Sequence, residues 1–188
     1  MRRFTRKGSV LTARMSEAEV AMLASLIGQL VELTTDALGE PAAESADPLE
    51  RLSAELSAEP DEPEQSGDPV IQRLFPNPYP HDPQAASDYR RYTQADLRDQ
   101  LVAHARQVLD DLAASGSGSR PVAVAEADVD SWLKVLTALR LSLAARLGVS
   151  DAEGVEELAA LPEDDARAYL YSVFEWLGFA QETLVGSL

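Results

Sequence analysis

The sequence contains no cysteine and only two histidines among its 188 residues. Without cysteine, the protein has no thiol for catalysis, no disulfide and no cysteine ligand for zinc or an iron–sulfur cluster. The absence of cysteine agrees with a cytoplasmic protein, because disulfides are rare in the cytoplasm. There is no run of about 18 apolar residues, and the basic start is not followed by the apolar core of a signal peptide. We therefore expect a cytoplasmic protein that does not enter a membrane.

The two histidines give little support to a metal site or a catalytic site. His104 falls on the apolar face of a predicted helix, where a packed ring with satisfied hydrogen bonds is the usual interpretation. His81 stands beside Asp82 in a proline-rich turn, whereas a metal site needs several converging donors. No phosphate-binding loop, nucleophile motif or dinucleotide-binding glycine pattern occurs. We expect no enzyme activity, no metal and no cofactor.

Charge is distributed unevenly along the chain, whose formal net charge is −16. Residues 1–14 contain five basic residues and no acid, so the other 11 basic and 32 acidic residues carry −21. A body this acidic repels phosphate, which argues against direct nucleic-acid binding. Two interpretations of the basic start stay open. It neutralises the acidic body, or it contacts nucleic acid or an acidic partner through basic residues beside an aromatic one. The candidate contact residues are Arg2, Arg3, Phe4, Arg6 and Lys7.

Local signals predict the elements of the first 39 residues. Two short apolar runs flank Gly8-Ser9, which predicts a basic N-terminal hairpin over residues 1–15. Ser16 and Glu19 form a capping box, because each side chain satisfies a backbone amide of the other residue. The helix that follows is expected to end near Gly39.

Residues 39–69 differ from the rest in composition. They contain five prolines, ten acidic residues and one arginine. Such a composition buries too little apolar area to offset the entropy of ordering, so we expect an acidic, proline-rich mobile segment. Asp47-Pro48 is a helix-start signal inside it and predicts a short helix over residues 48–57. Asp68-Pro69 and Asp82-Pro83 repeat that signal.

The stretch from Arg73 to Pro83 holds four prolines and two aromatic residues. Proline fixes φ and removes a backbone donor, so neither a helix interior nor a central strand fits this stretch. Large aromatic side chains are rare in flexible linkers, which favours a rigid connector packed into the core. Its structural residues are Arg73, Leu74, Phe75, Pro76 and Tyr79.

Three further long helices are predicted after the connector. The first opens at Thr93, and its inward face is Leu97, Leu101, His104, Val108 and Leu112. The second follows a short strand at residues 122–124 and ends at Gly148. The third begins at about residue 163. Arg98 and the other arginines of these helices are expected to form surface ion pairs.

Two similar segments lie 109 residues apart. Residues 16–20 and 125–129 each follow a short apolar strand and open a long apolar helix. Two explanations stay open: capping signals recur in unrelated helices, or two strand–helix units share one small sheet.

Aromatic residues of the last helix extend beyond its principal apolar face. Tyr169, Tyr171, Trp176 and Phe179 together form more aromatic surface than a monomer of this size usually exposes. A homodimer is one hypothesis. A partner site that includes Tyr169, Trp176 and Phe179 is the other.

Three segments resemble an actinobacterial domain-of-unknown-function family that includes an oxidative-stress regulator, AosR. These segments are Arg73–Thr93, Ser131–Gly148 and Trp176–Glu182. The resemblance implies a transcription-associated regulator of the stress response that acts through protein contact. Family members are typically encoded near a Clp-protease adaptor and cysteine-biosynthesis genes, which implies a link to proteolysis or sulfur metabolism. The redox switching attributed to the named regulator requires a cysteine pair. Thiol-based sensing is therefore absent here or belongs to a partner.

We predict a single, mainly α domain over residues 1–188, with four long helices, short connecting helices and a two- or three-stranded sheet. An all-helical bundle with a disordered start is the alternative. The expected function is regulation through a protein partner such as the transcription machinery, without enzyme activity. The alternatives are an adaptor linked to Clp proteolysis and a subunit of an uncharacterised enzyme.

Overall fold

In the computed structural model, which describes residues 1–39, 66–162 and 164–188, three strands form one antiparallel sheet. Strands β1 (Thr5–Lys7) and β2 (Val10–Ala13) form the predicted hairpin, and Gly8 turns the chain with a φ of 65°. Strand β3 (Val122–Ala125) pairs with the free side of β2, so the sheet order is β1-β2-β3. This confirms the hairpin. Of the two explanations for the repeated segments, it supports two strand–helix units that share one sheet.

Helix α1 (Glu17–Leu38) begins and ends at the predicted residues. The Ser16 hydroxyl and the Glu19 carboxylate form the capping box, and Gly39 follows the last turn with a φ of 83°. By length and composition α1 would suffice to cross a membrane, a test that the core helices of water-soluble proteins also pass. Its apolar stripe is buried within the protein, with Leu23 and Ile27 fully covered.

The segment between α1 and the connector falls mainly outside the described residues. The predicted mobile segment is described only at its two ends, and the helix expected over residues 48–57 is not included. The two later helix-start signals are confirmed. Asp68 caps α3 (Pro69–Leu74) and Asp82 caps α4 (Pro83–Tyr89), each by accepting a backbone N–H through its carboxylate.

The long helix predicted from Thr93 begins earlier in the structure. Helix α4 continues through a π-helical turn at Arg90–Gln94 into α5 (Ala95–Ala114) without leaving helical geometry. The predicted boundary was wrong because residues 84–95 contain no glycine or proline that would end the helix begun at Asp82.

Three α-helices follow strand β3 in the described residues. A single 3-10 turn (Glu126–Asp128) leads from β3 into α6 (Val129–Leu147), which ends at Gly148 in the left-handed conformation. The short α7 (Ala152–Ala159) was not predicted. Helix α8 (Ala166–Val185) begins three residues after the predicted start, because Asp165 is its N-cap.

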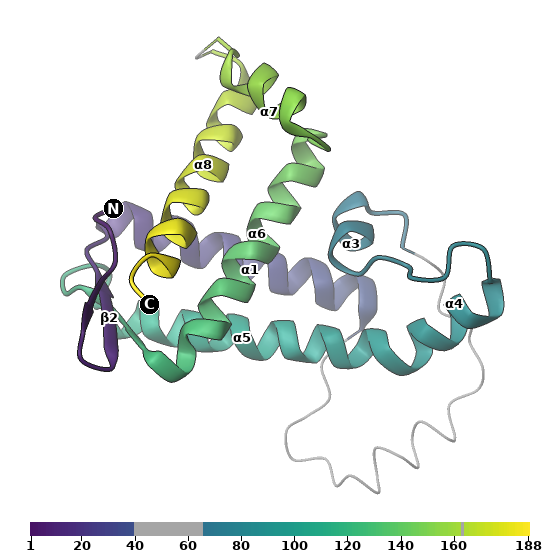
Figure 1. Ribbon diagram of the computed structural model, residues 1–188, viewed down its shortest axis with the longest axis horizontal. Helices are drawn as coiled ribbons and strands as arrows, with labels where there is room; N and C mark the ends of the chain where they lie inside the picture. Colours follow the sequence, from purple (N-terminus) through teal and green to yellow (C-terminus); the bar gives the residue numbers. More distant parts are fainter. Residues whose placement is uncertain (40–65, 163) are drawn as a thin grey trace, which may run out of the picture.

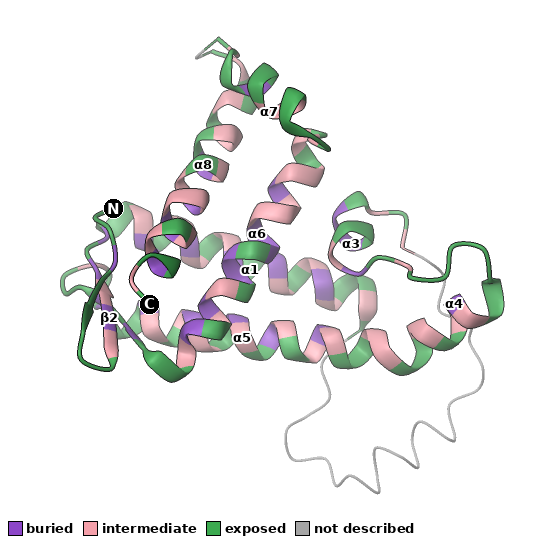
Figure 2. Ribbon diagram, viewed as in Figure 1, coloured by how far each residue is buried: buried purple, intermediate pink, exposed green. Residues whose placement is uncertain are grey.

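The described fold confirms a mainly α class with four long helices and a small sheet. Helices α1 and α5 run along the long axis, whereas α6 and α8 lie side by side and project away from them (Figure 1). Buried residues gather where these helices and the sheet meet (Figure 2). Trp132 is the largest fully buried side chain, and the ring of Phe4 meets it edge-on with centroids 6.0 Å apart.

Candidate functional site

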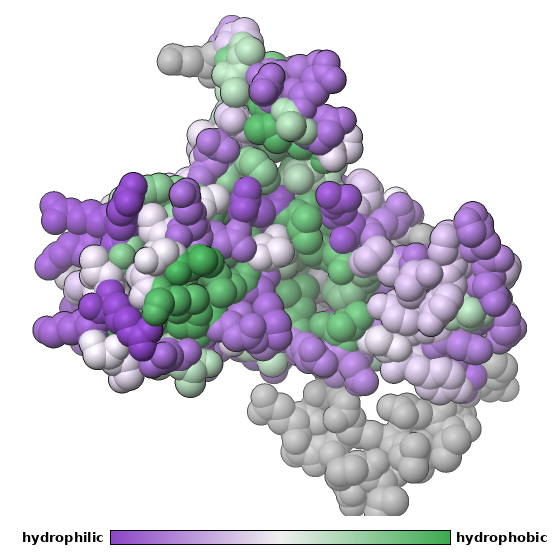
Figure 3. All heavy atoms as spheres, in the orientation of Figure 1, coloured by the Kyte–Doolittle hydropathy of each residue, from purple (hydrophilic) through white to green (hydrophobic). Residues whose placement is uncertain are grey.

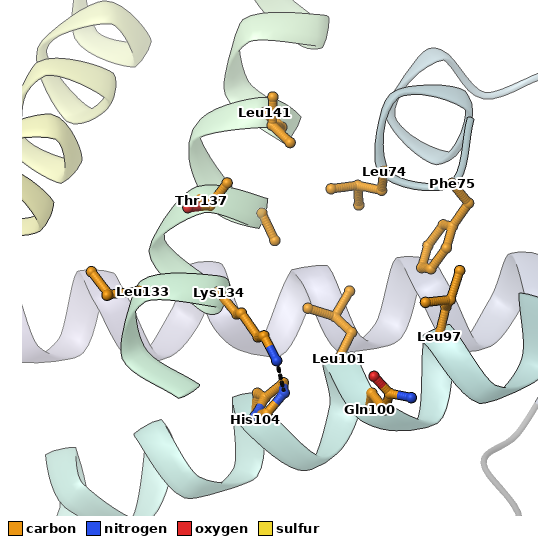
Figure 4. Close-up of a pocket in the computed structure, with 11 residues that line it drawn as sticks. Leu74, Phe75, Leu97, Gln100, Leu101, His104, Leu133, Lys134, Thr137 and Leu141 are labelled. Carbon is orange, nitrogen blue, oxygen red and sulfur yellow. Dashed lines mark hydrogen bonds between the residues drawn. The ribbon is translucent and has the colours of Figure 1, made fainter. Parts of the chain in front are cut away.

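A groove of about 380 Å³ lies between α3, α5 and α6. Five of its eleven lining residues are leucines, and Figure 3 shows an apolar hollow at this place, to the right of a second apolar patch on the same face. In the close-up of Figure 4, Leu97 and Leu101 rise from α5, Leu74 reaches across from the end of α3, and Leu141 lies on α6. Four aliphatic side chains from three helices thus surround one open space.

The groove exists because the leucine face of α5 is only partly covered. Leu97, Leu101 and His104 were predicted to face inward, and the structure leaves all three half-buried. The fully covered stripe of α5 is instead Arg98, Val102, Ala105, Val108 and Leu112. The first two turns of this face are only partly covered because α3 packs mainly against α6 rather than along α5.

His104 and Lys134 form one polar edge of the groove. The Nζ atom of Lys134 lies 3.3 Å from Nε2 of His104 and 2.8 Å from a carboxylate oxygen of Asp130. Burial and the neighbouring Lys134 charge lower the pKa of His104, while Asp130 opposes this in part. Since an ammonium only donates, Nε2 accepts and the ring proton sits on Nδ1, which donates to the Ser131 hydroxyl at 2.9 Å. The ring is half-buried and hydrogen-bonded at both nitrogens, as predicted.

The connector supplies the end of the groove nearest α3. Phe75 is 8% exposed and lines the groove, in agreement with the predicted packing of this ring. Tyr79 departs from the prediction, because it is 47% exposed and meets only the Tyr89 ring edge-on, with centroids 6.3 Å apart. Arg73 and Pro76 are exposed.

The basic start divides into buried and exposed residues. Phe4 is only 4% exposed and packs in the core, so it is not the surface contact that the sequence had suggested. The Arg6 guanidinium pairs with the Glu126 carboxylate at 2.8 Å and donates to the backbone oxygen of Leu188. Arg2, Arg3 and Lys7 are exposed. Only part of this segment is therefore available to a partner.

The aromatic residues of α8 also differ in how far they are exposed. Trp176 packs against the core, and its indole N–H donates to the Glu19 carboxylate at 3.0 Å. Phe179 is half-buried, and Tyr169 is 66% exposed. Of the three α8 residues proposed for a partner, Tyr169 alone is largely exposed, because α8 presents Trp176 to the start of α1.

Comparisons with known proteins place the chain in a family. A family model described as "Domain of unknown function (DUF2017)" matches residues 1–188. The chain belongs to this family. It is similar to the oxidative stress regulator AosR of Mycobacterium tuberculosis and of Mycobacterium bovis, at 26% identity over 194 residues in each case. These alignments cover 96% of this chain and 83% of each relative. No solved structure shows a significant match.

The groove of this DUF2017 chain was not anticipated from sequence. The spacing of Leu97, Leu101 and His104 did mark one helix face, but an incompletely covered face and a buried one have the same periodicity. Within the described ranges, no group of three histidine, aspartate or glutamate side chains is arranged to hold a metal ion.

Proposed function

We propose that this DUF2017 protein is a non-enzymatic regulator of the stress response that acts by binding another protein through the α3–α5–α6 groove. The relationship to AosR, a named oxidative stress regulator, supports the regulatory part. The open leucine-lined groove is the observation that supports binding of another protein. Apolar surface left in water is the usual mark of a contact site.

The occupant that fits best is an amphipathic helix of a partner protein with basic residues beside its apolar face. Helices bind grooves of this kind through side chains spaced three and four residues apart. Leu97 and Leu101 on α5, and Leu133 and Leu141 on α6, offer a row of contacts on each wall. The net charge of −16 steers a basic partner toward the protein and disfavours an acidic one.

The acidic charge also argues against action on DNA by this protein alone. One charge of the basic start is already matched, since the Arg6 guanidinium pairs with the Glu126 carboxylate. Beyond a Debye length of about 8 Å, the acidic body outweighs the remaining basic residues. We propose transcription-associated regulation through protein contact in the cytoplasm, without membrane association. No binding to random duplex DNA is expected at micromolar protein and physiological salt.

An adaptor linked to Clp proteolysis is the second candidate, and the same groove would serve it. An accessory subunit of an enzyme is the third. These candidates differ in the partner, so identifying the partner distinguishes among them.

Affinity capture from native cells, with a matched pair of variants, tests the proposal. Leu97→Glu places a charge in the groove, whereas Val185→Glu places the same charge at an exposed apolar position elsewhere, which is 52% exposed. A specific partner should be captured by the wild type and by Val185→Glu and lost with Leu97→Glu. The purified partner should then rebind with the same order of affinities.

The captured protein decides the class of function. A component of the transcription machinery supports the proposal, and a Clp component supports the adaptor. Equal capture by Leu97→Glu and the wild type would refute the groove as the site. Sequence-selective DNA binding by the isolated protein at submicromolar concentration would refute regulation by protein contact alone.

A further inference from the structure

Arg140 on α6 is held in an unusual environment beside α8. Its guanidinium lies over the Phe174 ring, with the guanidinium carbon 4.9 Å from the ring centroid. One terminal nitrogen donates to the Gln181 side-chain oxygen at 2.9 Å. The surface of Gly178 is so close that a Cβ there would lie 3.6 Å from the guanidinium carbon. The group is thereby fixed in position on one side.

The charge of Arg140 is not matched by an acid in the described part of the chain. The hydrogen bond that its guanidinium makes there goes to the uncharged Gln181 side chain, and its Nε atom is buried without a hydrogen-bond partner. A buried guanidinium donor that lacks an acceptor is destabilising, because it has lost water and gained nothing in its place. The ring of Phe174 offsets part of this loss but accepts no conventional hydrogen bond.

A pocket of about 360 Å³ opens beside this guanidinium, between α3, α6, α7 and α8. A second arginine, Arg73 from α3, lines it, and the hydroxyl-bearing Thr137 and Ser150 line it as well. Asp151 also borders the pocket, but its carboxylate caps α7 by accepting the Gly154 N–H at 3.0 Å.

The rest of the lining is largely apolar. It includes Leu141, Val149 and Val155. The volume lies at the lower end of the range for small-molecule sites, about 300–1,000 Å³. A pocket with two arginines and apolar walls is suited to a small ligand that carries a negative group on an apolar body.

We propose that this pocket binds a small organic anion, a carboxylate or a phosphate, whose charged group pairs with Arg140 and Arg73. Because stacking on Phe174 holds the Arg140 guanidinium in place, its terminal N–H groups can pair with such a group with less loss of side-chain entropy. The apolar body of the ligand lies against Leu141 and Val155. Binding of an anion in this pocket would not require a protein bound in the α3–α5–α6 groove.

Calorimetric titration with benzoate, phenyl phosphate and the neutral benzyl alcohol tests the proposal on the full chain. The wild type should bind at least one of the two anions at millimolar concentrations and should bind benzyl alcohol at least about tenfold more weakly, since charge-assisted pairing supplies the selectivity. The stronger of the two anions identifies the preferred head group.

Three arginine variants assign the binding to the pocket. Arg140→Met should weaken anion binding at least about tenfold, and Arg73→Gln about threefold or more, because each removes one charged partner. Arg106→Gln removes the same charge from an exposed position on α5 and should leave binding unchanged. Circular dichroism melting checks that each variant folds. If Arg140→Met does not fold, anion binding by Arg73→Gln still tests the proposal, because Arg73 is exposed.

Two outcomes would overturn the proposal. One is that neither anion binds the wild type. The other is binding that Arg73→Gln and Arg140→Met leave unchanged, which would place the probe elsewhere. Loss of binding in the groove variant Leu97→Glu alone would assign the probe to the groove.

Discussion

Replacing Glu19 by glutamine is expected to weaken the link between α1 and α8. The Glu19 carboxylate accepts hydrogen bonds from the Ser16 backbone at 2.8 Å and the Ser16 hydroxyl at 2.9 Å. It also accepts the Trp176 indole N–H at 3.0 Å and pairs with the Met1 ammonium group. One carboxylate therefore joins the chain start, the cap of α1 and the middle of α8.

The magnitude follows from the pKa of this group. Burial alone would raise the pKa of Glu19, but the hydrogen bonds from Met1, Ser16 and Trp176 outweigh burial and lower it from 4.5 to about 2. At about 1.4 kcal/mol per pKa unit, the full difference corresponds to roughly 3 kcal/mol. Because the side chain is 21% exposed, solvent screening reduces the expected contribution to about 1–2 kcal/mol.

The sign of the pH dependence is set by the lowered pKa. A carboxyl group that ionises more easily in the folded state stabilises the fold above its unfolded pKa of 4.5, and this stabilisation is lost as the pH falls toward 2. Urea unfolding of the wild type and Glu19→Gln should differ by about 1–2 kcal/mol at neutral pH and converge in acid.

Glu17→Gln provides the matched control for this measurement. Glu17 lies in the same first turn of α1 but is exposed, so its replacement should change the free energy of unfolding by less than about 0.5 kcal/mol. An equal loss in both variants would refute the hydrogen-bonding explanation in favour of a general helix-dipole effect. A Glu19→Gln difference that does not change with pH would refute the ionisation argument.

Three other predictions concern packing and assembly. Phe75→Ala should destabilise the fold by about 3–5 kcal/mol because the ring is buried, whereas Tyr79→Ala should cost less than about 1 kcal/mol in the same urea titration. Equal effects would contradict the assigned burial of the two rings. Deletion of residues 1–14 should lower stability by more than about 3 kcal/mol, since it removes the buried Leu11 and two of the three strands of the sheet. Unchanged stability would make the hairpin a dispensable arm. A homodimer predicts a mass of twice 20.3 kDa by light scattering at micromolar concentration, and 20.3 kDa at every concentration would refute it.

Elements that depend on local chemistry could be predicted from the sequence. The Ser16–Glu19 capping box and the Asp68-Pro69 and Asp82-Pro83 starts involve groups within a few residues of one another, and the structure shows all of them. The hairpin at Gly8-Ser9 is local in the same sense.

Features that depend on distant partners could not be predicted in this way. Arg98 was expected to form a surface ion pair. It does pair with Asp99, but it is only 6% exposed and also donates to the backbone oxygens of Leu38 and Gly39 at 2.6 and 3.0 Å. It thereby satisfies the last carbonyls of α1, some 60 residues away. No pattern within α5 distinguishes that role from a solvent-exposed one.

The candidate site, too, depends on distant partners that local sequence patterns do not reveal. Helical periodicity located the Leu97–Leu101 face, but the packing of α3 against α6 is what leaves this face partly uncovered. The sequence likewise surrounds Phe4 with basic residues, which suggested a surface contact, while the fold turns its ring toward Trp132. Long-range packing, rather than local propensity, separates the residues available to a partner from those held in the core.

The strand order β1-β2-β3 has a consequence for synthesis of the chain. Strand β2 cannot complete its pairing until β3 has been made, because Ala13 pairs with Val122, about 110 residues later. At about 5–20 residues per second, the ribosome needs roughly 5–20 s to reach it. During that interval, one edge of β2 and the apolar Leu11 stay open to other nascent chains. The outer strand of the hairpin carries Arg6 and Lys7, both exposed, and such charges keep the opposite edge from recruiting another strand. The basic start thus guards only the outer edge of the hairpin, whereas the edge of β2 is covered once β3 pairs with it.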